Sequence, residues 1–573
     1  MKTRDELLMQ KLQELHELYD EAEWLIGEIH RESLAGYHSQ RTGKVHGTNK
    51  SAEYAAAIFH TGQTEYYGRA ERVFLRLAEL QDTDISSDTF GLWPYYAEES
   101  LENMKAPDYN FSDFIGKHFI AALEEHEDEI THETAGIMRN TLKNAMACSI
   151  KRNVSPDYSN ISMMSCMTII SAGELLDDDA LRAAGKARLK KAYKYNKYSG
   201  AFSEYNSSTY TPLAIAELTR MMMFFRDEEC RRMAAELHDM AWENISDYYS
   251  VRIGELAPPQ KRCYHDLDDG QLGAFIYLAT DGRFGTIERT DDVILSYLTL
   301  PIRCPEKYFK NFEKTGERFI KKRYYKMNNI RTPDEDTVII RSLDSPDLYA
   351  STYITDKFAA GAFDKSDLWN QRRTCSVVWN SGGVHRGFRL RCINGSYDFC
   401  SGVVSAEMSG GVIIGCVGFV NDHGDYHYIL DKTKDGRITT GYLGFMFELC
   451  GDKDGVKVEQ AGGEYIISDG EIKIILCVKD WVFDGKKAEV RLDASKKTIE
   501  LIAYKGEEKT IDLNNIGPSY GAFAMSINEQ CPKLVGEDVG AEYTVTALEQ
   551  GIRASVPKEI GSFDEFMSNR MEG

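Results

Sequence analysis

The chain has 573 residues, with a hydrophobic fraction of 42% and a charged fraction of 28%. This is the composition of a globular protein, and it excludes a chain that is disordered throughout. The length exceeds what one ordinary hydrophobic core accommodates, so at least two domains are expected. The formal net charge is −22, and the densest basic stretch, 186–197, has the pattern of a solvated helix face, which argues against a nucleic-acid-binding protein.

No run of about 18 apolar residues occurs, so no membrane-spanning helix is expected. The segment 1–30 has the pattern of an amphipathic helix with charges throughout, and it lacks the apolar core of a secretory signal. The 12 Cys are scattered without a CxxC pair, which is typical of buried thiols in a reducing compartment rather than of a disulfide framework. These features predict a cytoplasmic protein.

From residue 4 to about residue 300, apolar residues recur at three- and four-residue spacing, which predicts helices. The clearest segments are 115–123, 137–150, 161–176, 213–225 and 233–242. Turns between them favour antiparallel helix pairs, arranged as a bundle, a solenoid or a closed toroid. The absence of a strict repeat period disfavours the solenoid.

Near residue 330 the pattern changes to short runs of β-branched and aromatic residues, many with period two. The runs include 337–341, 375–379, 387–391, 411–415, 426–430, 472–477 and 490–492. Turn signals such as Asn380 to Gly383 and Asp484-Gly485 separate them. The chain is therefore predicted to be an α+β multidomain protein, with a helical domain over residues 1–325 and an antiparallel β-sandwich over residues 326–573.

The segment 202–210 is a polar, aromatic loop that runs into a strongly apolar helix. It carries the candidate substrate-binding residues Glu204, Tyr205 and Asn206. Asn or Ser here can cap the helix, but capping does not explain the tyrosines. A Tyr at a helix N-terminus lies in positive potential, which favours the phenolate and makes Tyr210 a candidate base. The alternative for Tyr210 is a packing side chain with a hydrated hydroxyl.

Asn160 starts another helix in the same way, fifty positions before Tyr210. If two helix pairs lie between them, both helix starts face one end of the helical domain. An Asn amide that points at a carboxylate stabilises charge that develops there. A plain helix cap is the alternative for Asn160.

Trp93, Tyr95 and Tyr96 lie in a loop that contains Gly and Pro. Their amphipathic rings make suitable surfaces for sugars to stack on, so they are candidate substrate-binding residues. Packing of the rings onto the core is the alternative. Glu98 and Glu99 follow as candidate acids, although solvated charges are the simpler interpretation.

Arg262 lies in the segment 257–266 and could form paired hydrogen bonds with a substrate carboxylate. Tyr264 lies two positions further on and is a candidate substrate contact. A structural salt bridge is the alternative for Arg262. In the second half, His385 follows a Gly-Gly pair and is a candidate for a His that reaches into a cleft.

The segment 421–431 concentrates His and Asp residues. If it is extended, His423 and His427 lie on one face, and His427 is then a candidate to act on substrate. A structural divalent metal near His423, His427 and Asp431 is the less favoured interpretation, so no metal ligand is assigned.

A helical half followed by a sandwich resembles the heparinase II/III-like polysaccharide lyases and their alginate-lyase relatives. In that group an Asn near a helix start neutralises a uronate carboxylate, a Tyr at a later helix start transfers the proton, and a His from the sandwich assists. Asn160, Tyr210 and the run 423–431 carry the resemblance here. It implies an incomplete (α/α) toroid with an active site between the toroid and the sandwich.

The resemblance implies a carbon–oxygen lyase that cleaves a 4-linked uronic acid in an oligosaccharide by β-elimination. Asn160 with Arg262 would neutralise the carboxylate, and Tyr210 would take the C5 proton and then protonate the leaving oxygen. His427 would assist, and no cofactor is required. Self-association into a homo-oligomer is left open.

Two other functions remain open. A glycoside hydrolase on the same scaffold would pair Glu98 or Glu99 with Glu204. A non-catalytic carbohydrate-binding protein would use the aromatic loop around Trp93.

Overall fold

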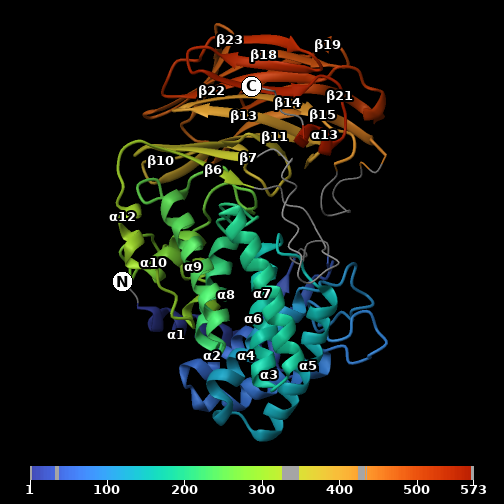
Figure 1. Ribbon diagram of the computed structural model, residues 1–573, viewed down its shortest axis with the longest axis vertical. Helices are drawn as coiled ribbons and strands as arrows, with labels where there is room; N and C mark the ends of the chain where they lie inside the picture. The colour runs from blue at the N-terminus through green and yellow to red at the C-terminus, as the bar shows by residue number, and fades with distance from the viewer. Residues whose placement is uncertain (1–2, 32–37, 325–347, 424–432, 434, 569–573) are drawn as a thin grey trace.

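The computed structural model describes residues 3–31, 38–324, 348–423, 433 and 435–568. Helices gather at one end of the molecule and strands at the other (Figure 1). The predicted fold class, a helical domain followed by antiparallel sheets, is confirmed. Among the described helices, none combines the length and apolar composition that crossing a lipid bilayer requires.

Antiparallel helix pairs build the first domain, and each pair adds one helix to an inner row and one to an outer row. The inner helices α2, α4, α6 and α8 contact one another in turn, while α3 contacts α5 and α7 contacts α9 on the outside. This is the arrangement of an incomplete (α/α) toroid. The bounds are α1 (Arg4–Leu18), α2 (Thr48–Thr61), α3 (Tyr67–Leu80), α4 (Phe111–His126), α5 (His132–Arg152), α6 (Ser159–Leu175), α7 (Asp179–Ser199), α8 (Tyr210–Phe224), α9 (Glu228–Tyr248), α10 (Gln271–Ala279), α11 (Leu295–Leu298) and α12 (Phe309–Phe312).

The sequence of α6 explains its central position. Helices α4, α5, α7 and α8 all contact it, and apart from Asn160 near its start and Glu174 near its end its residues are small or apolar on every face. A helix without a polar face must be enclosed on all sides. By contrast, α7 is amphipathic: Asp178 caps its start through the amides of Ala180 and Leu181, and Gly200 ends it in the left-handed conformation.

Helices α10 and α11 connect the last helix pair to the first. The ring of Trp242 in α9 stacks on Phe275 in α10 at 5.5 Å, and Phe275 meets Tyr297 in α11 at 5.0 Å. Arg4 in α1 donates to the carbonyls of Tyr297 and Leu278 at 2.9 and 3.0 Å.

The helix expected over residues 1–30 is shorter than predicted. It ends at Leu18, because β1 (Tyr19–Asp20) turns back and pairs with β2 (Leu25–His30), which in turn pairs with β3 (Gly43–His46). Helical spacing of the apolar residues does not reveal this hairpin, since cross-strand pairing decides it.

Two large antiparallel sheets enclose the core of the second domain. Within the described residues, one sheet has nine strands, with the order β20-β21-β15-β11-β10-β8-β7-β6 and β12 beside β11. Its strands are β6 (Arg318–Tyr324), β7 (Leu348–Ile354), β8 (Phe358–Phe363), β10 (Cys375–Ser381), β11 (Val384–Asn394), β12 (Tyr397–Asp398), β15 (Arg437–Gly451), β20 (Glu489–Asp493) and β21 (Thr498–Asp512).

The other large sheet has eight described strands, with the order β16-β17-β18-β22-β14-β13-β9 and β19 beside β18. They are β9 (Lys365–Asp367), β13 (Gly402–Ser409), β14 (Val412–Phe419), β16 (Lys457–Ala461), β17 (Glu464–Asp469), β18 (Ile472–Phe483), β19 (Lys486–Lys487) and β22 (Tyr520–Ile527). Three further strands pack on this sheet: β23 (Leu534–Val539) contacts β18, β24 (Glu542–Ala547) contacts β14, and β25 (Ile552–Pro557) contacts β13 and β14. Helix α13 (Phe563–Ser568) follows.

The predicted hairpin turns are confirmed where the chain is described. Ser381 pairs with Val384 across two glycines with positive φ. Phe483 pairs with Lys486 across Asp484 and Gly485, whose φ values of 53° and 67° are those of a type I′ turn. The predicted strands 337–341 and 426–430 lie outside the described residues.

The domain boundary and the state of the cysteines were also predicted from the sequence. The domain boundary between residues 325 and 326 stays a prediction, and β6, which precedes it, pairs with β7 in the nine-stranded sheet. Cys477 and Cys531 form a disulfide, so the expectation of free thiols is wrong for this pair, while the other ten cysteines are free and buried.

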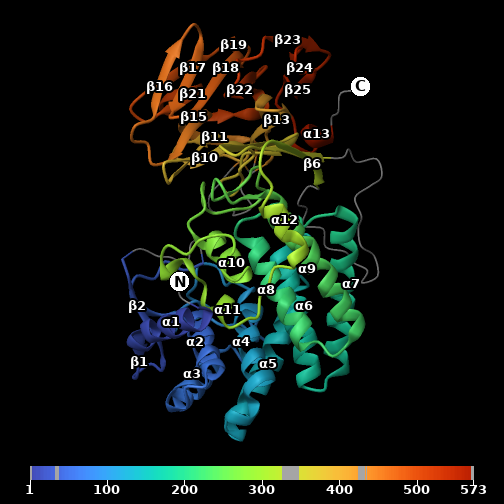
Figure 2. The same cartoon turned by 90° about the vertical axis from the view of Figure 1, so that its left-hand side faces the viewer.

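Loops of the helical domain lie against the sheet that contains β6 and β10 (Figure 2), and the segment 257–263 makes backbone contacts there. Gln260 and Arg373 exchange backbone hydrogen bonds of 3.0 and 2.9 Å, and Thr352 donates to the Pro258 carbonyl at 2.7 Å. A Cβ on Gly361 would lie 2.1 Å from the Pro258 carbonyl oxygen, so only glycine fits this part of β8. The segment that carries Arg262 is therefore held by backbone contacts.

Candidate active site

The starts of α6 and α8 both lie beside the segment 257–263. One helix pair, α6 and α7, lies between Asn160 and Tyr210, rather than the two pairs considered from the sequence. The hydroxyl oxygen of Ser159, the first residue of α6, accepts from the amide of Ser203 at 3.0 Å. Ser207 accepts from the amide of Tyr210 at 2.9 Å and so caps α8. The amide of Lys261 donates to the carbonyl of Tyr205 at 2.9 Å. These contacts connect three segments that are distant in sequence.

The Glu204 carboxylate is the centre of the site. The side-chain amide of Asn160 donates to its two oxygens at 2.7 and 2.8 Å, and the backbone amide of Asn160 donates at 2.8 Å. Arg262 Nη1 lies 3.3 Å from Oε1. Burial raises the pKa of Glu204, while the charge of Arg262 and the hydrogen bonds from Asn160 oppose the rise.

The Arg262 guanidinium is buried among aromatic rings. It lies 5.0 Å from the ring centroid of Tyr210, 5.3 Å from Trp369 and 5.6 Å from Tyr158. Its Nε donates to Gln371 Oε1 at 2.7 Å. Its Nη2 has no hydrogen-bond partner in the part of the chain that the structure describes, so a buried cation keeps donor capacity for a further acceptor.

The Tyr210 hydroxyl forms a short hydrogen bond with the Tyr264 hydroxyl at an exposed position, and Tyr264 is half-exposed. Burial of the Tyr210 ring raises its pKa strongly, although the charge of Arg262 opposes the rise. The expectation that the helix start favours the phenolate is therefore wrong for the free protein, because burial outweighs the helix potential. Tyr210 is a neutral phenol at pH 7.

The side chains of Tyr205 and Asn206 contact other parts of the protein. The Tyr205 ring is buried and its hydroxyl lies 2.6 Å from that of Tyr248. Asn206 adopts a left-handed backbone with φ of 52°, and its amide donates to the carbonyls of Ala257 and Pro259 at 2.7 and 3.0 Å. Both residues hold the segment next to Arg262, so the structure does not support them as substrate contacts.

The aromatic loop is not part of this cluster. Trp93 is 1% exposed and its ring nitrogen donates to the Leu77 carbonyl at 2.7 Å, so a sugar cannot stack on it. Tyr96 is also buried. Tyr95 is partly exposed, and its ring lies 4.2 Å from that of Phe111. These three residues pack the loop onto the helices.

Glu98 and Glu99 do not approach Glu204 by any hydrogen bond or ion pair among the described residues. Glu98 accepts from the backbone amide of His46 at 3.0 Å and contacts the ring of the same residue. Glu98 is thus held by His46, and the pairing of Glu98 or Glu99 with Glu204 in a hydrolase stays a prediction.

His385 on β11 forms a second charged cluster at the junction. Its Nδ1 lies 2.6 Å from Glu255 Oε1, and this hydrogen bond raises the pKa of His385. Burial, with the charge of Glu255, raises the pKa of Asp268 to about 7. Gly254 has a φ of +76°, and a Cβ there would lie 2.8 Å from the His385 ring. The imidazole is thus enclosed on one side by backbone.

His427 and Asp431 lie outside the described residues, so their predicted roles stay predictions. His423 is described: its Nε2 lies 2.6 Å from Asp367 Oδ2, and its ring stacks on Phe563 at 3.8 Å. This is the environment of a packed structural histidine.

Sequence reasoning missed three residues that surround Arg262. Tyr158 lies two positions before Asn160, and its aromatic side chain was the one feature that could have suggested a contact with Arg262. Trp369 and Gln371 come from the connection between β9 and β10, more than one hundred positions after Arg262. No local pattern indicates that this connection meets the guanidinium.

The assembled site combines a buried cation, a buried carboxylate and an accessible pair of phenols. Such a site can attract an anionic group to Arg262 and can exchange a proton through Tyr210. The predicted site residues that the structure brings together are Asn160, Glu204, Tyr210, Arg262 and Tyr264.

Residues 6–273 match a family model described as a domain of unknown function, DUF8769. No curated protein matches the sequence. The chain is similar to a solved chondroitin AC lyase of Streptomyces coelicolor A3 in complex with chondroitin sulphate, with 9% identity over 97% of this chain and 84% of that chain and a TM-score of 0.48. It is also similar to heparinase III, with 9% identity, coverage of 90% and 82% and a TM-score of 0.43.

A third similar structure is heparan sulfate lyase HepC of Pedobacter heparinus, with 11% identity, coverage of 89% and 82% and a TM-score of 0.32. The group of lyases named from the sequence is therefore represented among the solved structures that this chain is similar to.

Proposed function

We propose that this protein is a lyase that cleaves a 4-linked uronic acid in an oligosaccharide by β-elimination. The observation that carries the proposal is the contact between Arg262 and Tyr210. The guanidinium lies 5.0 Å from the tyrosine ring centroid, while the tyrosine hydroxyl stays accessible. A carboxylate-binding cation next to an accessible proton-transfer group is what elimination from a uronate requires.

Arg262 Nη2 is the proposed donor to the uronate carboxylate. Neutralising this carboxylate stabilises the charge that develops when C5 loses its proton. Tyr210 Oη takes the C5 proton, the C4–O4 bond breaks with its electron pair moving to O4, and a C4–C5 double bond forms. Tyr210 then donates the proton to O4, so the phenolate is regenerated, the product carries a hydroxyl at C4, and no cofactor is consumed.

Tyr210 must lose its own proton before it can act as a base. The neighbouring guanidinium favours the phenolate, and Tyr264 is the hydrogen-bond partner that can accept the proton on its way to solvent. Because the pKa of Tyr210 is raised in the free protein, the reaction is expected to accelerate as the pH rises.

Glu204 is proposed to position the other two groups. Its carboxylate holds the side-chain amide of Asn160 and one nitrogen of Arg262. In this arrangement the Asn160 side-chain amide donates to Glu204. It would have to break these hydrogen bonds before it could donate to the carboxylate of the uronate. Arg262 is therefore the proposed principal partner of the substrate.

The test is to incubate the purified protein with a panel of uronate-containing oligosaccharides, while ultraviolet absorbance of the unsaturated uronate and new reducing ends are both recorded. The proposal predicts that absorbance rises together with the reducing ends. Reducing ends without a rise in absorbance would indicate hydrolysis and overturn the proposal.

One observation favours hydrolysis as the second candidate function. Burial raises the pKa of Asp157 to about 6, and the charge of Glu204 adds to the rise. Glycosidases usually catalyse hydrolysis with a buried acid of raised pKa and a second carboxylate nearby. In that case Asp157→Asn would abolish cleavage, whereas the elimination proposal predicts that it does not.

A further inference from the structure

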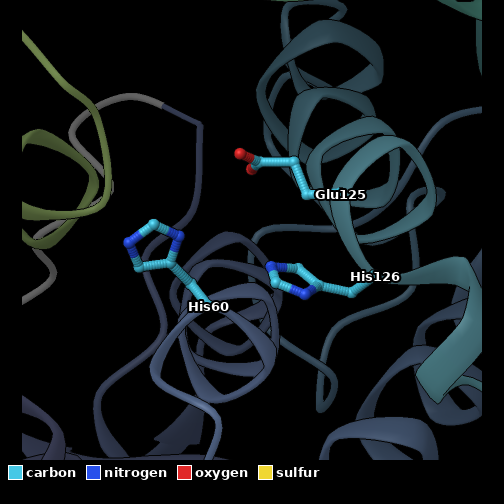
Figure 3. A group of neighbouring side chains, drawn as sticks. All are labelled: His60, Glu125 and His126. Carbon is cyan, nitrogen blue, oxygen red and sulfur yellow. The ribbon is translucent and has the colours of Figure 1, made fainter.

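A group of potential metal ligands lies at the ends of two inner helices, and the proposed lyase reaction does not use it. His60 is in the last turn of α2, and Glu125 and His126 end α4. One nitrogen of each His and one carboxylate oxygen all lie within 4.8 Å of one another. In Figure 3 the Glu125 side chain extends over the gap between the two imidazole rings. Two helices that pack together thus bring these side chains to one point.

The hydrogen bond of His126 Nδ1 leaves the lone pair of its Nε2 available to bind a metal. Nδ1 lies 2.7 Å from Glu129 Oε2 and donates to it, which leaves the proton off Nε2. Nε2 is buried and has no hydrogen-bond partner among the described residues. Metal-binding histidines commonly donate their other nitrogen to a carboxylate in this way, and the pairing fixes both the tautomer and the ring orientation.

The electrostatic environment also favours a cation. Both His60 and His126 lie in the final turn of a helix, where carbonyl groups without helical partners carry the negative end of the helix dipole. The short helix that follows α4 consists of Glu127, Asp128 and Glu129. Glu127 pairs with Arg139, so the two helix C-termini and the Glu129 carboxylate are the groups that lower the cost of holding a divalent ion.

We propose that His60, Glu125 and His126 bind one divalent transition metal ion, of the Zn²⁺ class. Two nitrogens and one oxygen are donors that suit Zn²⁺, whereas Ca²⁺ and Mg²⁺ take oxygen ligands. Ligands at zinc bond lengths of about 2.0–2.2 Å stand about 3.4 Å apart. His60 and Glu125 are exposed, so their side chains can rotate inward by the remaining distance. Water completes the coordination.

The ion would tie the end of α2 to the end of α4. These helices are neighbours in the inner row, so the bound ion is expected to raise the melting temperature of the helical domain, by an amount that grows with the logarithm of the ratio of ion concentration to Kd. The site shares no residue with the cluster around Arg262, so its occupancy and the lyase reaction can be measured separately.

The test is calorimetric titration of untagged, chelator-treated protein with Zn²⁺, and with Ca²⁺ and Mg²⁺ for comparison. One Zn²⁺ per chain is expected, with no measurable uptake of the other two ions at the same concentrations. His60→Gln and His126→Gln should each weaken binding at least tenfold. Glu129→Gln should weaken it by about tenfold, because it removes the partner of Nδ1.

The matched control is His132→Gln, which removes an exposed histidine at the start of α5 and should leave affinity unchanged. Thermal melting supplies the second measurement: Zn²⁺ should stabilise the wild-type protein and the control, and should not stabilise His60→Gln. Unchanged binding in both His60→Gln and His126→Gln, or an absence of Zn²⁺ uptake by the wild-type protein, would overturn the proposal.

Discussion

Two charged clusters lie at the junction between the helical domain and the nine-stranded sheet, and they hold their cations differently. The Arg262 side chain is 8% exposed, and aromatic rings surround it. The His385 side chain is 31% exposed and depends on one carboxylate, Glu255. A guanidinium keeps its charge at every physiological pH, whereas an imidazole loses its charge as the pH rises through its pKa.

The difference indicates that Arg262 keeps its charge at every physiological pH and that the charge of His385 depends on pH. In a chain with a net charge of −22, Arg262 keeps donor capacity beyond Glu204 for an acidic substrate, whereas His385 lies among the carboxylates Glu255 and Asp268. Only the Arg262 cluster also presents accessible hydroxyl groups. The reaction is therefore expected to depend strongly on the Arg262 cluster and weakly on the His385 cluster.

The largest expected effect is that of Tyr210→Phe. It removes the proposed proton-transfer group and leaves the ring in place, so kcat should fall by about 10²–10⁴-fold, the usual contribution of such a group. Tyr264→Phe is the matched control, because it removes the hydroxyl on the other side of the same hydrogen bond. Initial rates with an excess of substrate provide the measurement. Equal losses in the two variants would contradict the assignment of Tyr210.

The next effect is that of Arg262→Gln on kcat/KM, which should fall by about 10²–10³-fold, the cost of removing one principal charge-stabilising donor. Arg373→Gln is the control, since Arg373 is also buried at the junction and pairs with Asp266 at 2.8 Å. Circular dichroism should precede the kinetics, because both variants remove a buried cation from a carboxylate. Glu204 keeps the hydrogen bonds from Asn160, and Asp266 keeps Arg389 at 2.7 Å. A similar loss per folded molecule in both would indicate a general effect on the junction.

The pH profile should follow Tyr210. Its pKa is raised by burial and the active form is the phenolate, so the deprotonated fraction grows with pH. We expect kcat/KM to rise by about tenfold per pH unit between pH 7 and 9, the slope of a single deprotonation. In Arg262→Gln the pKa should rise further, because the opposing positive charge is absent. A profile that falls with alkaline pH would contradict a tyrosine base.

The smallest effect is that of His385→Gln. Its hydrogen bond to Glu255 raises the pKa of His385 in the folded protein, so the imidazolium stabilises the fold below its unfolded pKa and loses this contribution as pH rises through the folded pKa. The free energy of unfolding of His385→Gln should be lower than that of the wild-type protein by up to about 1 kcal/mol at pH 6. The difference should be smaller at pH 9. Denaturant titrations measure it, with the exposed His265→Gln as control.

Much of the architecture could be predicted because its signals are local. Helical spacing of apolar residues, period two in the strands and the Asp484-Gly485 turn all depend on neighbours in sequence. Asn160 and Tyr210 could be proposed as partners because both start helices. The hairpin at 19–30 could not be predicted, since strand pairing overrides a helical pattern there.

The site was harder to predict where burial decides the role of a residue. Trp93 and Tyr205 have the composition of sugar contacts, yet both rings are enclosed by packing that their neighbours in sequence do not reveal. Gln371 and Trp369 reach Arg262 only because β9 and β10 place their connection there. The raised pKa of Tyr210 likewise follows from burial by distant segments rather than from its position at the helix start.

The central claim is that the bond is broken by elimination at the Arg262 cluster, and the masses of the products test it most directly. The purified protein should cleave a defined uronate oligosaccharide in water labelled with the heavy oxygen isotope, and mass spectrometry should follow both fragments. Elimination adds no atoms of water, so we expect the fragment masses to sum to that of the substrate, without the label. Fragments that sum to the substrate plus one labelled water would establish hydrolysis and contradict the account.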